Sequence, residues 1–213
     1  MQKRRKTQEQ RRAETRARLI TATLELLIHR GYARATAADI AERAGVTRGA
    51  LNHHFASKHD LVVQAVEHLL RSTIEDIRAL AKRVRAGSMT LSEFIDKLWD
   101  MFSGPLFLVT LEYVTEARHS PFLKERLVPV VRDFHAALDS IWREFFKDTG
   151  LDDAQIETAF NASLCLLRGM GLQTILRDDP LYYRRIADFW KGILAGFSQQ
   201  NRSRVRPGKV AGR

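Results

Sequence analysis

The chain has 213 residues, of which 45% are hydrophobic, and a formal net charge of +10 at pH 7. This length is sufficient for a small domain and a larger one with its own core. No run approaches the ~18 apolar residues of a membrane span, and the basic N-terminus lacks the apolar region of a signal peptide, so we expect a cytoplasmic protein without membrane segments. The single cysteine, Cys165, excludes an intrachain disulfide, and its leucine neighbours predict a small buried residue.

The positive charge is concentrated in residues 1–60 and 201–213, and the body between them is close to neutral. Residues 1–14 are basic and lack apolar periodicity, so we expect a disordered, mobile arm that could track a nucleic-acid backbone or enter a minor groove; the alternative is a solubilising tail. In residues 201–213, where basic side chains lie among Pro and Gly, a disordered solubilising tail is the favoured interpretation. This uneven distribution is typical of proteins that neutralise phosphates.

Residues 36–61 predict two short helices joined by a tight turn. Thr36 is followed three residues later by Asp39, a capping-box pattern in which each side chain satisfies a free backbone N–H group at a helix start. Gly45 then stands where the chain needs a left-handed conformation that only glycine adopts without steric cost. The first helix therefore begins after Thr36 and ends after about two turns. Its short apolar face consists of Ile40, Ala41 and Ala44.

The second of these helices has an apolar inner side and a polar outer side. Thr47 is placed to cap it, and Leu51 would bury its inner side. The outer side is narrow and rich in hydrogen-bond donors, which suits a helix that enters a DNA major groove. Ser57 and Asp60 repeat the capping-box pattern and open a further helix, whose first turn carries a cation that would bind phosphate. The DNA-binding candidates are Thr36, Thr47, Arg48, Gly49, Asn52, His53, His54 and Lys58.

These motifs, with the helix before them, resemble the DNA-binding domain of TetR-family transcriptional regulators. The resemblance covers residues 15–65 and rests on LITATLELLIHRGYARAT, ADIAERAGVTRGAL and the HHF-x-SK-x-x-L junction. It implies a dimeric regulator, most often a repressor, that pairs through its last two helices and binds a palindromic operator. One departure is Asn52, where such proteins usually carry a tyrosine that contacts the DNA backbone. An asparagine can instead pair bidentately with adenine.

Helical patterns with regular stop signals fill the remainder of the chain and predict an all-α fold. A helix of about 25 residues across 61–84 would connect a DNA-binding domain, residues 15–60, to an effector-binding and dimerisation domain, residues 61–200. Thr90 and Glu93 form another capping box. Later helices are expected to run from 91 to the Gly104-Pro105 break, over 105–119 as a buried helix, over 121–150, and onward from 152 and from 180.

The middle helices mix aromatic residues with methionine, the chemistry of many small-molecule pockets, although an ordinary packed core explains each residue equally well. Polar residues in the same segments either orient a ligand or are satisfied structural groups. Arg168 interrupts the apolar run LCLLRGMGL, where a buried cation needs a partner or an anionic ligand. The ligand-binding candidates are Met101, Phe102, Phe107, Tyr113, Arg118, His119, Phe134, Trp142, Asn161 and Arg168.

The last two predicted helices stay apolar over wide faces and contain several glycines. Glycine inside a helix costs about 0.5–1 kcal/mol relative to alanine, so its repeated use suggests tight helix crossings. We therefore expect these helices to form a homodimer, with packing inside one chain as the alternative. The glycines are Gly169, Gly171, Gly192 and Gly196.

Three classes of function follow from these observations. The leading one is a ligand-responsive repressor whose partners are double-stranded DNA, a second copy of the chain and a small-molecule effector. The alternative is an effector-independent architectural or chromosome-associated DNA-binding protein. An enzyme is disfavoured because the sequence has no G-x-S-x-G elbow, P-loop, dinucleotide fingerprint or H-E-x-x-H motif, and we expect no cofactor. His53 and His54 are adjacent, but no cluster has metal-ligand spacing, so we expect no metal site.

Overall fold

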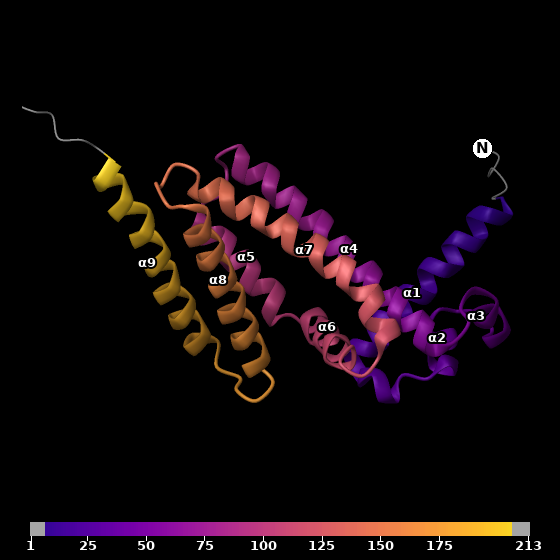
Figure 1. Ribbon diagram of the computed structural model, residues 1–213. Coiled ribbons are helices and arrows are strands. Elements are labelled where there is room, and N and C mark those ends of the chain that lie inside the picture. Colours follow the sequence, from indigo (N-terminus) through magenta and orange to yellow (C-terminus); the bar gives the residue numbers. More distant parts are fainter. Residues whose placement is uncertain (1–6, 206–213) are drawn as a thin grey trace, which may run out of the picture. The chain divides into compact units, whose positions relative to one another are not determined.

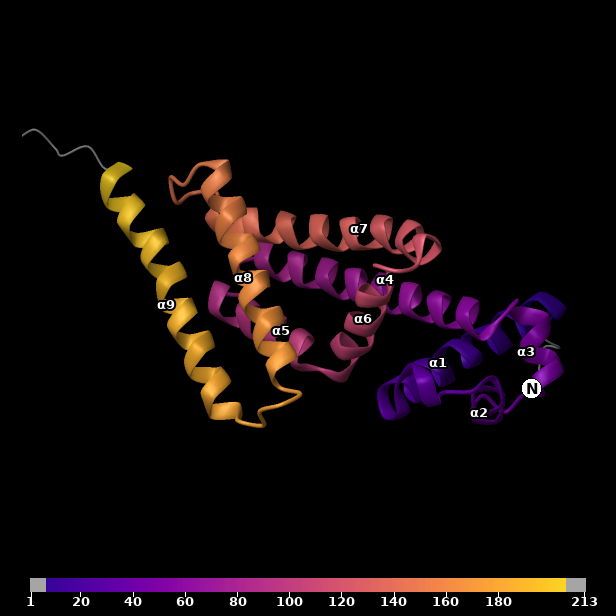
Figure 2. The same ribbon diagram turned by 60° about the horizontal axis from the view of Figure 1, so that its bottom comes forward.

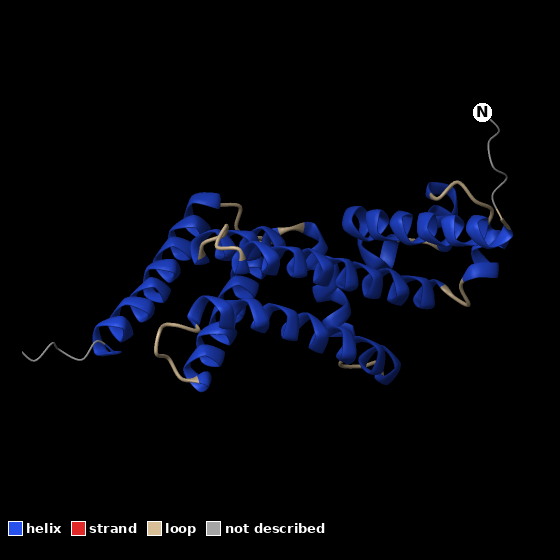
Figure 3. Cartoon of the chain, turned by 90° about the horizontal axis from the view of Figure 1, so that it is seen from above, coloured by secondary structure: helices blue, strands red, loops and turns tan. Residues whose placement is uncertain are grey.

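The computed structural model describes residues 7–205, and within this range every regular element is a helix (Figure 3). The predicted all-α fold is therefore confirmed for the described part of the chain. Coloured along the sequence in Figure 1, the helices are α1 (Gln8–Arg34), α2 (Ala37–Arg43), α3 (Arg48–His54), α4 (Lys58–Arg85), α5 (Leu91–Ser103), α6 (Pro105–Glu116), α7 (Pro121–Phe146), α8 (Asp153–Gln173) and α9 (Pro180–Val205). None of these helices is long and apolar enough to cross a membrane.

The chain divides into two compact units that interleave along the sequence. The first unit contains the chain up to Ser72 together with Leu108–Val131, and the second contains Thr73–Phe107 together with the chain from Arg132 onward. The helices α4, α6 and α7 therefore contribute residues to both units. The division after Ser72 falls within α4, which is one continuous helix of 28 residues. The sequence analysis placed the domain boundary at residue 60, near the start of this helix.

In the first unit, α1 begins earlier than the sequence suggested. Thr7 and Gln10 form a complete capping box, in which the Gln10 N–H donates to Thr7 Oγ1 over 3.2 Å. Residues 8–14, predicted to belong to a mobile arm, are therefore helical, because a capped segment without Gly or Pro can extend a helix without an apolar face. Residues 1–6 of that predicted arm lie outside the described part. The core of this unit includes Leu19, Ile20, Leu26, Leu27, Ile40, Leu51, Phe55 and Val62.

In the second unit, α8 lies beside α5 and α9 (Figures 1 and 2). Trp142 from α7 is fully buried and stacks on Phe146, with 5.0 Å between the ring centroids. Phe94 from α5 is also fully buried and packs against Phe145 at 5.4 Å. Aromatic side chains from several helices therefore make up much of this core.

The glycines of α8 and α9 differ in what surrounds them. A Cβ atom on Gly171 would lie only 2.0 Å from the backbone oxygen of Phe102, so this position needs glycine for a close crossing inside the chain. A Cβ atom on Gly169, Gly192 or Gly196 would meet no atom within 4 Å. The predicted tight crossing is thus confirmed within one chain for Gly171, whereas the other three positions are open in the single chain.

Two burial predictions were wrong. Cys165 is exposed, because each residue of a helix is rotated by about 100° from the one before it and the core takes its neighbour Leu164. In α6 only Val109 and Tyr113 are buried, and Val114 is 46% exposed, so this helix has one buried face and is not an interior helix. A continuous apolar run does not reveal which face of a helix has neighbours.

The last helix also extends further than expected. The sequence assigned residues 201–213 to a tail, but α9 continues to Val205. Residues 201–205 contain no Gly or Pro, so no stop signal ends the helix before Val205. Residues 206–213, which do contain Pro and Gly, lie outside the described part.

Candidate nucleic-acid interface

The start of α2 is fixed by the predicted capping box. The backbone N–H of Asp39 donates to Thr36 Oγ1 over 3.1 Å, and the N–H of Thr36 donates back to Asp39 Oδ2 over 3.1 Å. The Thr36 hydroxyl also donates to Asp39 Oδ2 over 2.7 Å, and this bond, followed by the one from the Thr36 backbone N–H, holds the pKa of the Asp39 carboxyl below its ordinary value. Thr36 is exposed and its hydroxyl caps α2, so a DNA contact by this residue stays a prediction.

A tight turn joins α2 to α3. Gly45 has a φ of 65°, in the left-handed region, as its position in the sequence predicted. Thr47 then caps α3 by accepting a hydrogen bond from the Ala50 N–H over 3.1 Å. Leu51 and Phe55 are 1% and 2% exposed, so one side of this seven-residue helix is anchored in the core. The opposite side is thereby presented outward.

The outward side of α3 carries free hydrogen-bonding groups. Arg48, Gly49, Asn52 and His53 are exposed, and within the described residues the side chains of Arg48 and Asn52 make no hydrogen bond or ion pair. His54 is half-buried, and burial together with the charge of Arg12 lowers its pKa. The exposed candidates on α3 therefore share one helix face, and His54 lies outside it.

Lys58 lies in a different setting from the one we expected. Its Nζ donates to the backbone oxygen of Tyr32 over 2.7 Å and stands 4.2 Å from the centroid of the Tyr32 ring. Burial lowers the pKa of this ammonium group. A lysine stem is long and flexible, so a phosphate contact by Lys58 stays a prediction that requires the side chain to leave the end of α1.

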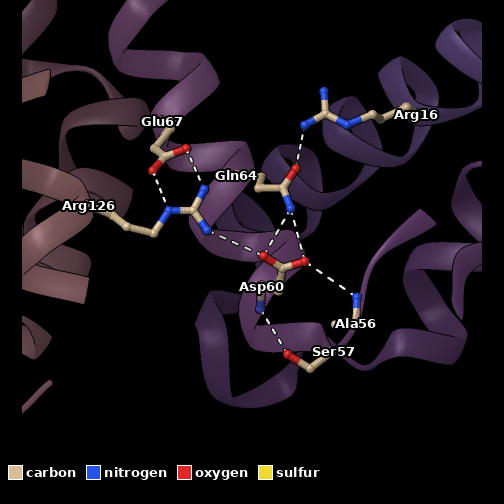
Figure 4. A network of polar contacts seen from close by, with 7 residues as sticks. All are labelled: Arg16, Ala56, Ser57, Asp60, Gln64, Glu67 and Arg126. Carbon is tan, nitrogen blue, oxygen red and sulfur yellow. Dashed lines mark hydrogen bonds and ion pairs between the residues drawn. The ribbon is translucent and has the colours of Figure 1, made fainter. Parts of the chain in front are cut away.

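A polar network at the start of α4 was not foreseen (Figure 4). Arg126 from α7 donates through Nε and Nη2 to the two carboxylate oxygens of Glu67, each over 2.7 Å, and its Nη1 lies 3.4 Å from Asp60 Oδ1. Asp60 also accepts from Gln64, whose side-chain oxygen accepts from Arg16 of α1. These bonds to carboxylates raise the pKa of Arg126. The network joins α1, α4 and α7 within the first unit.

The sequence carries a local pattern for the two carboxylates of this network but none for the arginine. Asp60 and Glu67 are seven residues apart, which places both carboxylates on one face of a helix. The arginine that they bind is 59 residues further along the chain than Glu67, and no local pattern identifies it.

The ligand-binding candidates do not form one group. Tyr113, Arg118 and His119 belong to the first unit, and the other seven belong to the second. Arg118, His119 and Asn161 are exposed, and the Asn161 amide donates to the backbone of its own helix at Glu157. The buried Tyr113 hydroxyl has no hydrogen-bond partner in the described structure, and burial raises its pKa.

Among the remaining candidates of the second unit, Phe102 lies in contact with Arg168. Phe102 and Phe107 meet edge to face at 5.2 Å, and the Arg168 guanidinium lies 5.5 Å from the Phe102 ring. Phe134 and Trp142 are buried, and Met101 is half-buried. The sequence analysis missed Phe160, which completes this cluster together with His135, and these two residues come from the same two helices as Phe134, Trp142 and Arg168.

Apolar side chains also remain exposed along α8 and α9. A groove of about 390 Å³ runs between these helices and includes Thr158, Trp190 and Phe197 in its lining. Trp190 Nε1 donates to Ser163 Oγ over 2.8 Å, which fixes one wall of the groove. Large apolar residues that are more than 40% exposed on or between the two helices are Leu172, Ile175, Leu176, Leu181, Phe189 and Phe197.

Metal-ligating side chains do not cluster in the described part of the chain. Within residues 7–205 there is no group of three or more His, Cys, Asp or Glu side chains that could hold an ion. His53 and His54 are in ring contact, with 5.9 Å between their centroids.

Comparison with known proteins gives a consistent set of similarities. Residues 19–65 match the family described as bacterial regulatory proteins, tetR family. The chain is 28% identical over 190 residues to the HTH-type transcriptional regulator CymR of Pseudomonas putida, covering 87% of this chain and 92% of that protein. It is 36% identical over 133 residues to an uncharacterized HTH-type transcriptional regulator of Mycobacterium tuberculosis, covering 62% of this chain and 68% of that protein.

A solved structure shares the fold over most of the chain. It is a putative transcriptional regulator from Saccharomonospora viridis in complex with choline. The TM-score is 0.67 at 18% sequence identity, over 86% of this chain and 96% of that chain.

Proposed function

This chain belongs to the TetR family of bacterial transcriptional regulators, and we propose that it is a repressor that binds a palindromic operator as a homodimer and is released by a small molecule. Its DNA-binding element is the helix-turn-helix formed by α2 and α3. The operator, the dimer and the release by an effector are each open to a separate experiment.

The exposed face of α3 carries the proposal. Arg48 and Asn52 lie on that face and make no hydrogen bond or ion pair within the described residues, so their donors are available to base edges. The opposite face is anchored by Leu51 and Phe55, which leaves the helix one orientation in which it can approach DNA. An α-helix with this polarity fits a major groove, and arginine and asparagine are suited to bidentate pairing with guanine and adenine.

A homodimer would bring two such helices into one complex. The exposed apolar residues on and between α8 and α9, with Leu176 at 93% and Phe189 at 70% exposure, form a surface that a second copy can cover. Gly169, Gly192 and Gly196 leave open space on these two helices and would permit close approach of a partner helix. A two-fold axis would repeat the reading helix at a spacing of about one or more turns of DNA, ~34 Å each, which selects a palindrome.

A small-molecule effector is supported by the aromatic cluster of the second unit and by the choline complex of the regulator from Saccharomonospora viridis. The effector would act by binding the DNA-free form more tightly than the DNA-bound form. Linkage requires the two affinities to change by the same factor, with ~1–3 kcal/mol a typical coupling energy. An architectural DNA-binding protein without an effector would instead keep the same operator affinity in every ligand titration. This constant affinity distinguishes it from a ligand-responsive repressor.

The proposal is tested by footprinting and sedimentation of the full chain. We expect a dimer at micromolar concentration that protects a palindromic site. Arg48→Ala and Asn52→Ala should relax the sequence preference, each at a cost of ~1–3 kcal/mol at one base pair. Lys58→Ala should weaken specific and random DNA alike and reduce the salt dependence by about one unit of log–log slope.

Two results would contradict the assignment of roles. Equal losses on all DNA sequences for Arg48→Ala, Asn52→Ala and Lys58→Ala would show that α3 does not read bases. A monomer that protects no palindrome would exclude the dimeric repressor.

A further inference from the structure

Arg168 is a half-buried cation without a carboxylate partner. Its Nη2 lies 2.8 Å from His135 Nε2, and its guanidinium carbon lies 5.5 Å from the centroid of the Phe102 ring. No Asp or Glu side chain forms an ion pair with Arg168 anywhere in residues 7–205. Burial lowers the pKa of this guanidinium below its ordinary value.

The contact with His135 leaves the positive charge uncompensated. A guanidinium has only donors, so His135 Nε2 must accept, and the imidazole is then neutral with its proton on Nδ1. Burial, followed by the charge of Arg168, lowers the pKa of His135, which favours the same neutral form. The pair therefore carries one net positive charge and retains four guanidinium N–H donors outside this bond.

A second donor lies in the same cluster. The Trp142 side chain is fully buried, and its Nε1–H has no hydrogen-bond partner in the described structure. Trp142 packs against Phe160 at 5.8 Å, and Phe160 in turn packs against His135 at 6.5 Å between ring centroids. Arg168 and Trp142 are thus linked by a short series of ring contacts among α7 and α8.

Leaving these groups without acceptors is costly. A buried donor without a partner costs roughly 1–3 kcal/mol, and a buried charge without a counter-ion costs more. Folded proteins therefore pair such groups with protein atoms, water or a ligand. Here two donors, one of them a cation, belong to a cluster of aromatic side chains that can hold an apolar body.

We propose that the effector is an apolar monocarboxylate, bound by Arg168 among the aromatic side chains of the second unit. This inference rests on the proposed ligand-responsive function and gives the effector a chemical class. A carboxylate matches the planar guanidinium in bidentate geometry, and Trp142 supplies a further unpartnered donor within the same cluster. The rings of Phe102, Phe134 and Phe160 would bury the apolar part.

The first experiment compares ligands that differ only in charge. Calorimetry on the full-length protein would use octanoate against octanamide and phenylacetate against phenylacetamide. Octyl phosphate and octyltrimethylammonium would test another anion and a cation. We expect at least about tenfold tighter binding of a carboxylate than of its amide, because an ionic hydrogen bond is worth about 1.5–3 kcal/mol.

The second experiment assigns that preference to Arg168. Arg168→Gln should abolish the tenfold preference for carboxylate over amide, and Arg168→Lys should keep part of it, since lysine retains the charge without the bidentate geometry. Arg132→Gln is the matched control, because Arg132 lies on α7 less than one turn from His135 but has a 76% exposed side chain. This control should bind both ligands as the wild type does. Thermal unfolding of each variant verifies that it folds.

Several outcomes would overturn the inference. They are equal binding of acid and amide, preference for the cation or for octyl phosphate, a folded Arg168→Gln variant that keeps the preference, and no binding of either carboxylate up to about 1 mM. Operator release separates this inference from the proposed function. Carboxylate binding through Arg168 without release would refute the repressor mechanism alone, and release by a neutral or cationic probe would refute the carboxylate alone.

Discussion

Each of the two units contains a half-buried arginine, and the two arginines differ in how their charge is compensated. In the first unit, Arg126 binds both oxygens of Glu67 and approaches Asp60, so its charge is more than balanced by carboxylates (Figure 4). In the second unit, Arg168 has only the neutral imidazole of His135 and the ring of Phe102. Both arginines contact a neighbouring helix, yet only Arg126 forms ion pairs with carboxylates of the same chain.

This difference separates a structural role from a binding role. Arg126 joins α7 to the first three turns of α4, the helix that follows the DNA-reading segment, and nothing further is needed to satisfy it. Arg168 retains donors and charge that an anion can use. Removing each arginine should therefore have unequal consequences for stability, and the predictions below test that inequality.

The largest effect should come from the crossing one turn beyond Arg168. Gly171→Ala places a Cβ atom 2.0 Å from the backbone oxygen of Phe102, so α5 and α8 must move apart. We expect a loss of about 2–3 kcal/mol in the free energy of unfolding, measured with urea. Gly169→Ala is the control: its Cβ atom meets no other atom of its own chain, so the substitution, measured on the monomer at low protein concentration, should stabilise by roughly 0.5–1 kcal/mol. Similar effects of both substitutions would mean that α8 is not tightly packed there.

Arg126→Met should be the next largest change. It leaves the side chains of Glu67 and Asp60, which are 18% and 24% exposed, without their cation. Because these groups retain some water, we expect a loss of about 1–2 kcal/mol rather than the larger cost of a fully buried pair. Arg132→Met removes a charge whose side chain is 76% exposed and should change stability by less than about 0.5 kcal/mol. Equal losses would show that the Arg126 network is no more than a surface ion pair.

Arg168→Met should destabilise less than Arg126→Met. It removes an uncompensated charge and keeps an apolar side chain of similar length, so we expect a change within about 1 kcal/mol of zero. Urea unfolding in the absence of ligand makes the measurement. A loss as large as that of Arg126→Met would indicate that Arg168 is satisfied within the chain, and the contrast between the two units would disappear.

The smallest effect should be a pH dependence from His135. Its pKa in the folded protein is lowered from 6.5, so the unfolded chain takes up this proton at a higher pH than the folded chain does. Stability from this group is therefore complete above pH 6.5 and falls as the pH drops from 6.5 towards the folded pKa. His135→Gln keeps an acceptor for Arg168 and removes the proton uptake. The wild type should thus lose more stability than the variant between about pH 7.5 and 5.5, and identical slopes would contradict this.

The sequence by itself determined the helix-turn-helix. The Thr36–Asp39 capping box, the left-handed Gly45 and the Thr47 cap each involve residues within three or four positions of one another or a single backbone angle. Backbone geometry alone constrains such bonds, so the spacing of residue types is enough to predict them. The inner and outer faces of α3 followed from helical periodicity in the same way.

Only the tertiary structure decided which side chains meet across helices. The Arg126 and Glu67 pair spans 59 residues, and the Arg168 and His135 pair spans 33. The exposure of Cys165 and the difference between Gly171 and Gly169 likewise depend on which helix lies opposite, not on the residue's own segment. Periodicity gives a helix an apolar face, but the position of its neighbours sets how much of that face is covered, and a linear pattern does not contain that information.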